Sequence, residues 1–99
     1  MKVSFTARHF TASNDLKEYC NQAVQKLNNF FDHITSCDVI LEPASSSKTP
    51  QKAEINVRVP NKVLTVSIAA STYERAVHDG IENLSRQLKR YKQKRFAKH

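Results

Sequence analysis

The apolar residues of this chain follow two different periods, and the order of these periods limits the folds that the chain can adopt. Four segments alternate apolar and polar residues, a pattern typical of strands with one buried face: residues 2–9, 36–42, 53–59 and 63–70. Two segments instead place apolar residues three and four positions apart, as an amphipathic helix does: residues 14–32 and a stretch that begins at Tyr73. The predicted order is therefore β-α-β-β-β-α.

Local signals mark the starts of the two predicted helices. The letters TASN, residues 11–14, favour the N-terminus of the first helix. The letters STYE predict a capping box in which Ser71 and Glu74 satisfy each other's backbone N–H groups. Gly80, the only glycine, lies inside the second helix. Glycine costs about 1 kcal/mol there relative to alanine, so we expect close packing against it.

The connections between these segments predict the topology. A helical crossover joins the first two strands, so they can pair in parallel. Residues 60–62, PNK, predict a turn, and residues 43–52, PASSSKTPQK, predict a mobile loop. The sheet has one apolar face and each helix one apolar stripe, which favours packing of both helices on that face. The predicted fold class is α+β, a four-stranded mixed sheet with two helices packed on one face, in a single domain of residues 1–99.

The positive charge is concentrated at one end of the chain. The formal net charge is +7, yet residues 1–82 contain nine basic and nine acidic residues, so the whole excess follows Glu82. Such a cluster points to a nucleic acid or an anionic surface as partner. Like charges three or four apart on a helix repel by about 0.2–0.5 kcal/mol per pair. We therefore expect the end, residues 96–99 in particular, to fray until a polyanion binds. The alternative is a solvated helix end that serves solubility only.

Two sets of cations are the candidate nucleic-acid-binding residues. The second helix supplies six: Arg86, Lys89, Arg90, Lys92, Lys94 and Arg95. The first helix supplies Lys17 and Lys26. If the helices lie side by side, their outer surfaces form a cationic platform that suits phosphate backbones rather than base edges. Tyr91 and Phe96 could stack on an unpaired base, although Tyr91 also fits the rim of the core.

The sequence contains no recognisable catalytic or metal-binding motif. It has no glycine-rich phosphate loop, nucleophile elbow or helix-borne His pair, so we expect neither an enzyme nor a small-molecule substrate. The four histidines show no ligand spacing, and Cys20 and Cys37 fall on apolar faces. We expect reduced core cysteines, no metal and no cofactor. No apolar run approaches the ~18 residues that span a bilayer, which favours a cytoplasmic protein without membrane contact.

Five segments, in this order, resemble the bacterial ribosome hibernation promoting factors, also called ribosome-associated inhibitors: DLKEY, KLNNFFDHI, CDVILE, AEINVRV and LSRQLKRYKQK. The resemblance covers roughly residues 1–95, and it implies the same fold. It also implies a short-form member, monomeric off the ribosome, whose basic helices contact the ribosomal RNA of the small ribosomal subunit. Such proteins occupy the channel shared by messenger and transfer RNA in non-growing cells, and so silence translation.

Individual positions match this family unevenly. Basic residues that the resemblance implies are present at four positions: Lys26, Arg86, Lys92 and Lys94. In contrast, Gln22, Ala23 and Asn29 stand where relatives often carry lysine or arginine. The resemblance therefore implies that the second helix carries more of the binding than the first.

Two other interpretations stay open. A sheet with two helices on one face also fits a general double-stranded RNA-binding module. A basic amphipathic helix also fits docking on an anionic membrane or on a partner protein. A membrane surface would need exposed aromatic residues beside the cations, where the sequence offers only Phe96 and has no Trp.

Overall fold

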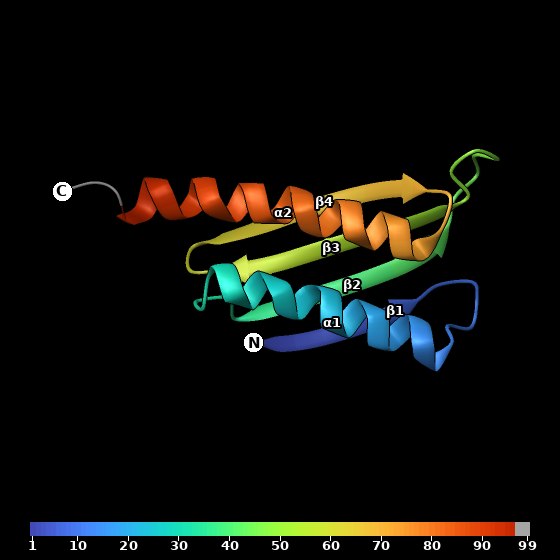
Figure 1. The fold of residues 1–99 in the computed structure, drawn as a ribbon, viewed down its shortest axis with the longest axis horizontal. Helices are drawn as coiled ribbons and strands as arrows, with labels where there is room; N and C mark the ends of the chain where they lie inside the picture. Colours follow the sequence, from blue (N-terminus) through green and yellow to red (C-terminus); the bar gives the residue numbers. More distant parts are fainter. Residues whose placement is uncertain (97–99) are drawn as a thin grey trace.

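The computed structural model describes the backbone of residues 1–96 and the side chains of residues 1–94. It contains four strands and two helices in the predicted order (Figure 1). The elements are β1 (Lys2–Ala7), α1 (Asn14–Phe30), β2 (Ser36–Pro43), β3 (Gln51–Val59), β4 (Lys62–Ala70) and α2 (Tyr73–Phe96). Neither helix, as far as it is described, is long and apolar enough to cross a bilayer.

The four strands form one mixed sheet in the order β1-β2-β3-β4. β1 and β2 pair in parallel, and the other two pairs are antiparallel. The register aligns Phe5 with Val39, Val39 with Ile55, and Ile55 with Val66. Because side chains alternate across a strand, this register brings the apolar residues of all four strands to one face.

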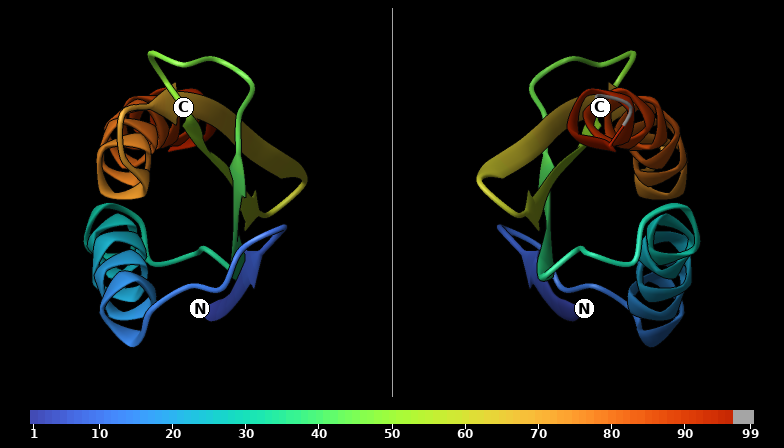
Figure 2. Two further views of the ribbon diagram at one scale, coloured as in Figure 1. Left: turned by 90° about the vertical axis from the view of Figure 1, so that its right-hand side faces the viewer. Right: turned by 90° about the vertical axis from the view of Figure 1, so that its left-hand side faces the viewer.

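Both helices cover that apolar face, side by side and running in the same direction (Figures 1 and 2). The core between the two layers is apolar, and its largest fully buried side chains include Leu27, Ile55 and Leu84. Cys20 and Cys37 are buried in it as free thiols, as predicted. The α+β fold with both helices on one face is therefore confirmed.

At Gly80, α2 packs closely against the sheet. A Cβ atom added to Gly80 would lie 3.0 Å from Ile55 Cδ1 and 3.3 Å from Val66 Cγ1. Ile55 and Val66 are paired neighbours on β3 and β4. The predicted close packing is confirmed, and the partner of the glycine is the sheet.

The predicted capping box at the start of α2 is wrong. The N-cap is Thr72, whose Oγ1 accepts from the Arg75 amide at 3.1 Å and whose carbonyl accepts from Ala76 at 3.0 Å. Capping one residue later places Arg75 where a capping box needs Glu or Gln. A residue from the sheet takes part instead, because Gln51 Oε1 accepts from the Tyr73 amide at 2.6 Å.

Other boundaries shift by a few residues. α1 begins as predicted, with the Ser13 side chain accepting from the Leu16 amide, but it ends at Phe30. β2 and β3 extend into the predicted loop and leave residues 44–50 between them. Pro60 and Asn61 form the two-residue turn, with Asn61 at φ 67°. Of the expected frayed segment 96–99, Phe96 is the last residue of α2 and the others lie outside the described residues.

The packing at Gly80 predicts a large effect of a bulky side chain there. Gly80→Leu must push α2 away from Ile55 and Val66, and overpacking of this kind costs roughly 1–3 kcal/mol. The free energy of unfolding, measured by urea denaturation, should fall by that amount. Gln93→Leu, at an exposed position of the same helix, is the control and should change it little. Equal effects of the two variants would show that α2 does not rest on the sheet at Gly80.

Candidate nucleic-acid interface

The C-terminal half of α2 presents five described cations to solvent. All are exposed: Arg86, Lys89, Arg90, Lys92 and Lys94. The sixth predicted cation, Arg95, lies in the last turns of α2, but its side chain is outside the described part. Among the described side chains, none of the five forms an ion pair with a carboxylate. Their charge is therefore available to an external anion.

These cations extend around α2 from one flank to the other. Lys89 and Lys92 line a groove shared with the end of α1. Arg90 and Lys94 line another on the opposite flank, together with Lys62 from the start of β4. Lys62 is exposed and extends the cationic surface onto the sheet. Sequence reasoning missed it, since only the tertiary structure brings it beside α2.

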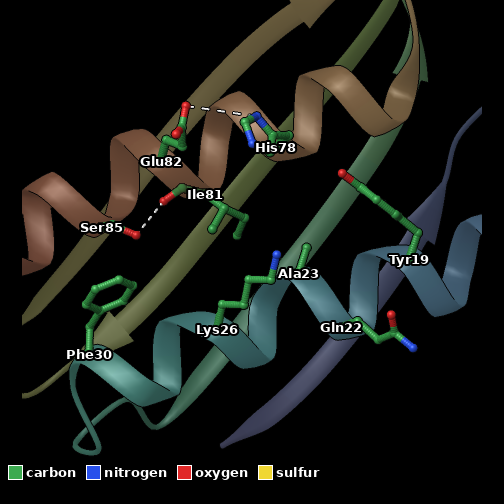
Figure 3. A pocket seen from close by; sticks show the side chains of 9 residues that line it. All are labelled: Tyr19, Gln22, Ala23, Lys26, Phe30, His78, Ile81, Glu82 and Ser85. Carbon is green, nitrogen blue, oxygen red and sulfur yellow. Dashed lines mark hydrogen bonds and ion pairs between the residues drawn. The ribbon is translucent and has the colours of Figure 1, made fainter.

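The two cations of α1 lie on different sides of that helix. Lys26 lines the groove between α1 and α2, with Tyr19 and Phe30 on its own helix (Figure 3). Lys17 is nine residues earlier, which is about two and a half helical turns, so it points to the opposite side of α1. Lys26 therefore faces α2, whose side of the groove is formed by His78, Ile81, Glu82 and Ser85, whereas Lys17 lies apart from it.

The N-terminal half of α2 differs in charge from its C-terminal half. Arg75 and Asp79 form an ion pair there at 3.3 Å. His78 Nδ1 lies 3.3 Å from Asp79 Oδ1. It also lies 3.9 Å from Glu82 Oε1 (Figure 3). Possible ligand atoms of His78, Asp79 and Glu82 all lie within 4.8 Å of one another, because positions 78, 79 and 82 share one side of the helix. This half carries three carboxylates, Glu74, Asp79 and Glu82, and one cation, Arg75, so the uncompensated positive charge of α2 belongs to its other half.

Tyr91 fixes the basic half of α2 to the rest of the fold. Its hydroxyl donates to the Pro60 carbonyl at 2.8 Å, and its ring meets that of Phe31 edge to face, with centroids 5.5 Å apart. It is half-buried against the core, as predicted for a residue at the rim. Because its hydroxyl and ring are already engaged, Tyr91 is poorly placed to stack on a base.

The two thiols are unsuited to nucleophilic chemistry at neutral pH. Burial, with a smaller contribution from Glu74, raises the pKa of Cys20 to about 11. Burial, with a smaller contribution from Asp38, raises the pKa of Cys37 to about 12. Both thiols are therefore protonated at pH 7, whereas the thiolate is the reactive species.

Comparison with known proteins identifies the family of this chain. The family described as "Sigma 54 modulation protein / S30EA ribosomal protein" matches residues 3–95. The chain belongs to this family. Two proteins with similar sequences are named "Ribosome hibernation promoting factor". The one from Pseudomonas putida is 26% identical over 94 residues, 95% of this chain and 89% of the relative. The one from Acidithiobacillus ferridurans is 24% identical over 68 residues, 69% of this chain and 87% of the relative.

Two solved structures share the fold of this S30EA family member. The N-terminal domain of Thermus thermophilus Protein Y superposes with a TM-score of 0.78 at 20% identity, over 92% of this chain and 99% of that one. A ribosomal subunit interface protein from Coxiella burnetii gives a TM-score of 0.82 at 18% identity, over 93% and 98%. The family resemblance noted in the sequence is confirmed by the family match.

The last turns of α2 should be the least stable part of the helix. They extend beyond the β3–β4 turn (Figure 1), and every described side chain after Tyr91 is exposed. Like-charge neighbours oppose the helix there by about 0.2–0.5 kcal/mol per pair. We expect the amides after Tyr91 to exchange with deuterium rapidly in the free protein, and to become protected in the presence of ribosomes. Equal protection in both states would contradict the role of charge repulsion.

Proposed function

We propose that this protein binds the small ribosomal subunit through its ribosomal RNA and silences the ribosome in non-growing cells. In this proposal the bound protein occupies the channel that messenger and transfer RNA share. The observation that carries it is the group of five exposed cations on α2 that form no ion pair among the described side chains, in a chain of the S30EA family. The names of the relatives, which refer to ribosome hibernation, support the same function.

The arrangement of the cations favours contact with phosphates. They lie on both flanks of one helix and on the adjoining β4, so they can follow a backbone but do not converge on one small ligand. Lysine and arginine bind phosphate oxygens without reading sequence, and such contacts set the position of a protein on RNA. The proposed interface is thus the C-terminal half of α2, with Lys26 and Lys62 at its borders.

The proposal is tested by cosedimentation with isolated small subunits on a sucrose gradient, with competitors. We expect the protein to travel with the subunit in the presence of excess free RNA duplex or of anionic vesicles. Displacement by duplex would favour a general double-stranded RNA-binding module, and transfer to vesicles would favour membrane docking. Failure to cosediment even without a competitor would contradict the proposal.

Binding through phosphates makes the affinity depend steeply on salt. Each phosphate that is neutralised contributes a slope of about −0.7 to −0.9 to a plot of log affinity against log salt concentration. With roughly five to eight contacts, the slope should lie near −4 to −7. The slope is obtained by repeating the subunit-binding titration between low and physiological salt. A slope shallower than about −2 would point to a largely uncharged interface.

The two helices should differ in their contributions. Charge-assisted hydrogen bonds are worth roughly 1.5–3 kcal/mol each, so replacing Arg86, Lys89 and Arg90 together by alanine should cost a few kcal/mol of subunit affinity by that estimate. Lys17→Ala with Lys26→Ala should cost less, because Lys17 lies away from the cations of α2. Thermal unfolding is the control and should stay unchanged or rise slightly in the triple variant. If the Lys17/Lys26 variant bound the subunit more weakly than the triple variant, α1 would contribute more to binding than α2, contrary to this prediction.

A further inference from the structure

Phe30 is the most exposed of the large apolar side chains that the structure describes. It is 57% exposed, compared with 46% for Val63 and 36% for Tyr19. A single exposed apolar side chain is common on protein surfaces. Exposure alone therefore assigns no role to Phe30. A role has to be argued from the residues that surround its ring.

Three grooves meet at Phe30, and cations line all of them. Lys26 lines the first, and Lys92 lines the second. Arg86, Lys89 and Lys92 line the third. The ring projects from the end of α1 toward α2, beside Ser85 (Figure 3). An accessible aromatic ring is thus bordered by four cations from two helices.

Two carboxylates, Asp32 and Glu82, also border these grooves, so the four cations leave a net charge of +2 around Phe30. Asp32 Oδ1 lies 3.6 Å from His33 Nε2, and Glu82 Oε1 lies 3.9 Å from His78 Nδ1. Neither carboxylate forms an ion pair with the four cations within the described part of the chain. The surroundings of Phe30 therefore favour a partner that combines negative charge with a flat apolar surface.

We propose that Phe30 is a stacking platform for one unpaired base of the bound RNA. Lys26, Lys89 and Lys92 hold the phosphates on either side of that base. A base inside a duplex has both faces covered by its neighbours, so only an unpaired base can offer a face to Phe30. Stacking on an aromatic ring is a common mode of recognition for unpaired bases, and it tolerates any base. The inference rests on the proposed function and adds a base contact to its phosphate contacts.

The salt dependence of binding separates this contact from the cationic ones. Stacking of a base on an aromatic side chain corresponds to about 5- to 150-fold in affinity. Phe30→Ala should therefore weaken binding to isolated small subunits by that factor at every salt concentration, with the log–log slope unchanged. Lys89→Ala should instead make the slope shallower by about 1, because one phosphate contact is lost.

Matched variants distinguish stacking from a general apolar contact. Phe30→Tyr keeps the ring and should keep the affinity, whereas Phe30→Leu keeps apolar character without a ring and should bind nearly as weakly as Phe30→Ala. Tyr19→Ala removes an aromatic residue of the same groove that lies away from Lys89 and Lys92, and should bind like the unaltered protein. Thermal unfolding of each variant checks that the fold is intact.

A cross-linking experiment identifies the partner of this position directly. Phe30→p-benzoylphenylalanine, irradiated on the subunit, should attach the protein to ribosomal RNA at an unpaired nucleotide. Attachment to a ribosomal protein, or full affinity of Phe30→Ala or Phe30→Leu, would overturn the stacking role and leave the proposed function standing. If the unaltered protein did not bind the subunit, the proposed function would fail first.

Discussion

Burial of the apolar stripe of α2 holds together cations that repel one another. Val77, Ile81, Leu84 and Leu88 are buried against the sheet and α1, and each such side chain contributes roughly 1.5–3 kcal/mol. The five like-charge pairs at intervals of three and four between Glu82 and the end of α2 oppose the helix by roughly 1–2.5 kcal/mol in total. Packing therefore exceeds repulsion up to Leu88, and Tyr91 is the last residue that secures the helix. Beyond Tyr91, no carboxylate of the described chain pairs with the surplus positive charge. An external polyanion is therefore the natural partner.

The fold could be predicted because its determinants are local and repeated. Alternation in the four strands and the three-and-four spacing in the two helices fixed the element order, and the single apolar face fixed the side on which both helices lie. Even the tight approach at Gly80 was foreseeable, because a lone glycine in a helix needs a reason. The predicted capping box was wrong because the start of α2 depends on a contact that is not local. Thr72 and Ser71 are both good N-caps, and Gln51, far away in the sequence, helps to select between them.

The candidate interface could be predicted only in part. The cations of α2 were evident, since no carboxylate separates them in the sequence. Lys62 joins them only because the β3–β4 turn lies beside α2. Lys17 and Lys26 lie on opposite sides of α1, because a spacing of nine residues corresponds to about two and a half helical turns. Phe30 continues the apolar series of α1, so the sequence pattern alone does not distinguish it from a core residue. Only the end of that helix at Phe30 and the position of α2 show that its ring remains exposed.

A cryo-electron microscopy structure of this protein on the small ribosomal subunit tests the central claim most directly. The account predicts that the C-terminal half of α2 lies along ribosomal RNA, with Arg86, Lys89 and Arg90 within hydrogen-bonding distance of phosphate oxygens. The open face of the sheet, opposite the helices, should then lie away from the RNA contacted by α2. A complex in which the sheet face contacts the RNA while these three side chains point into solvent would contradict the account.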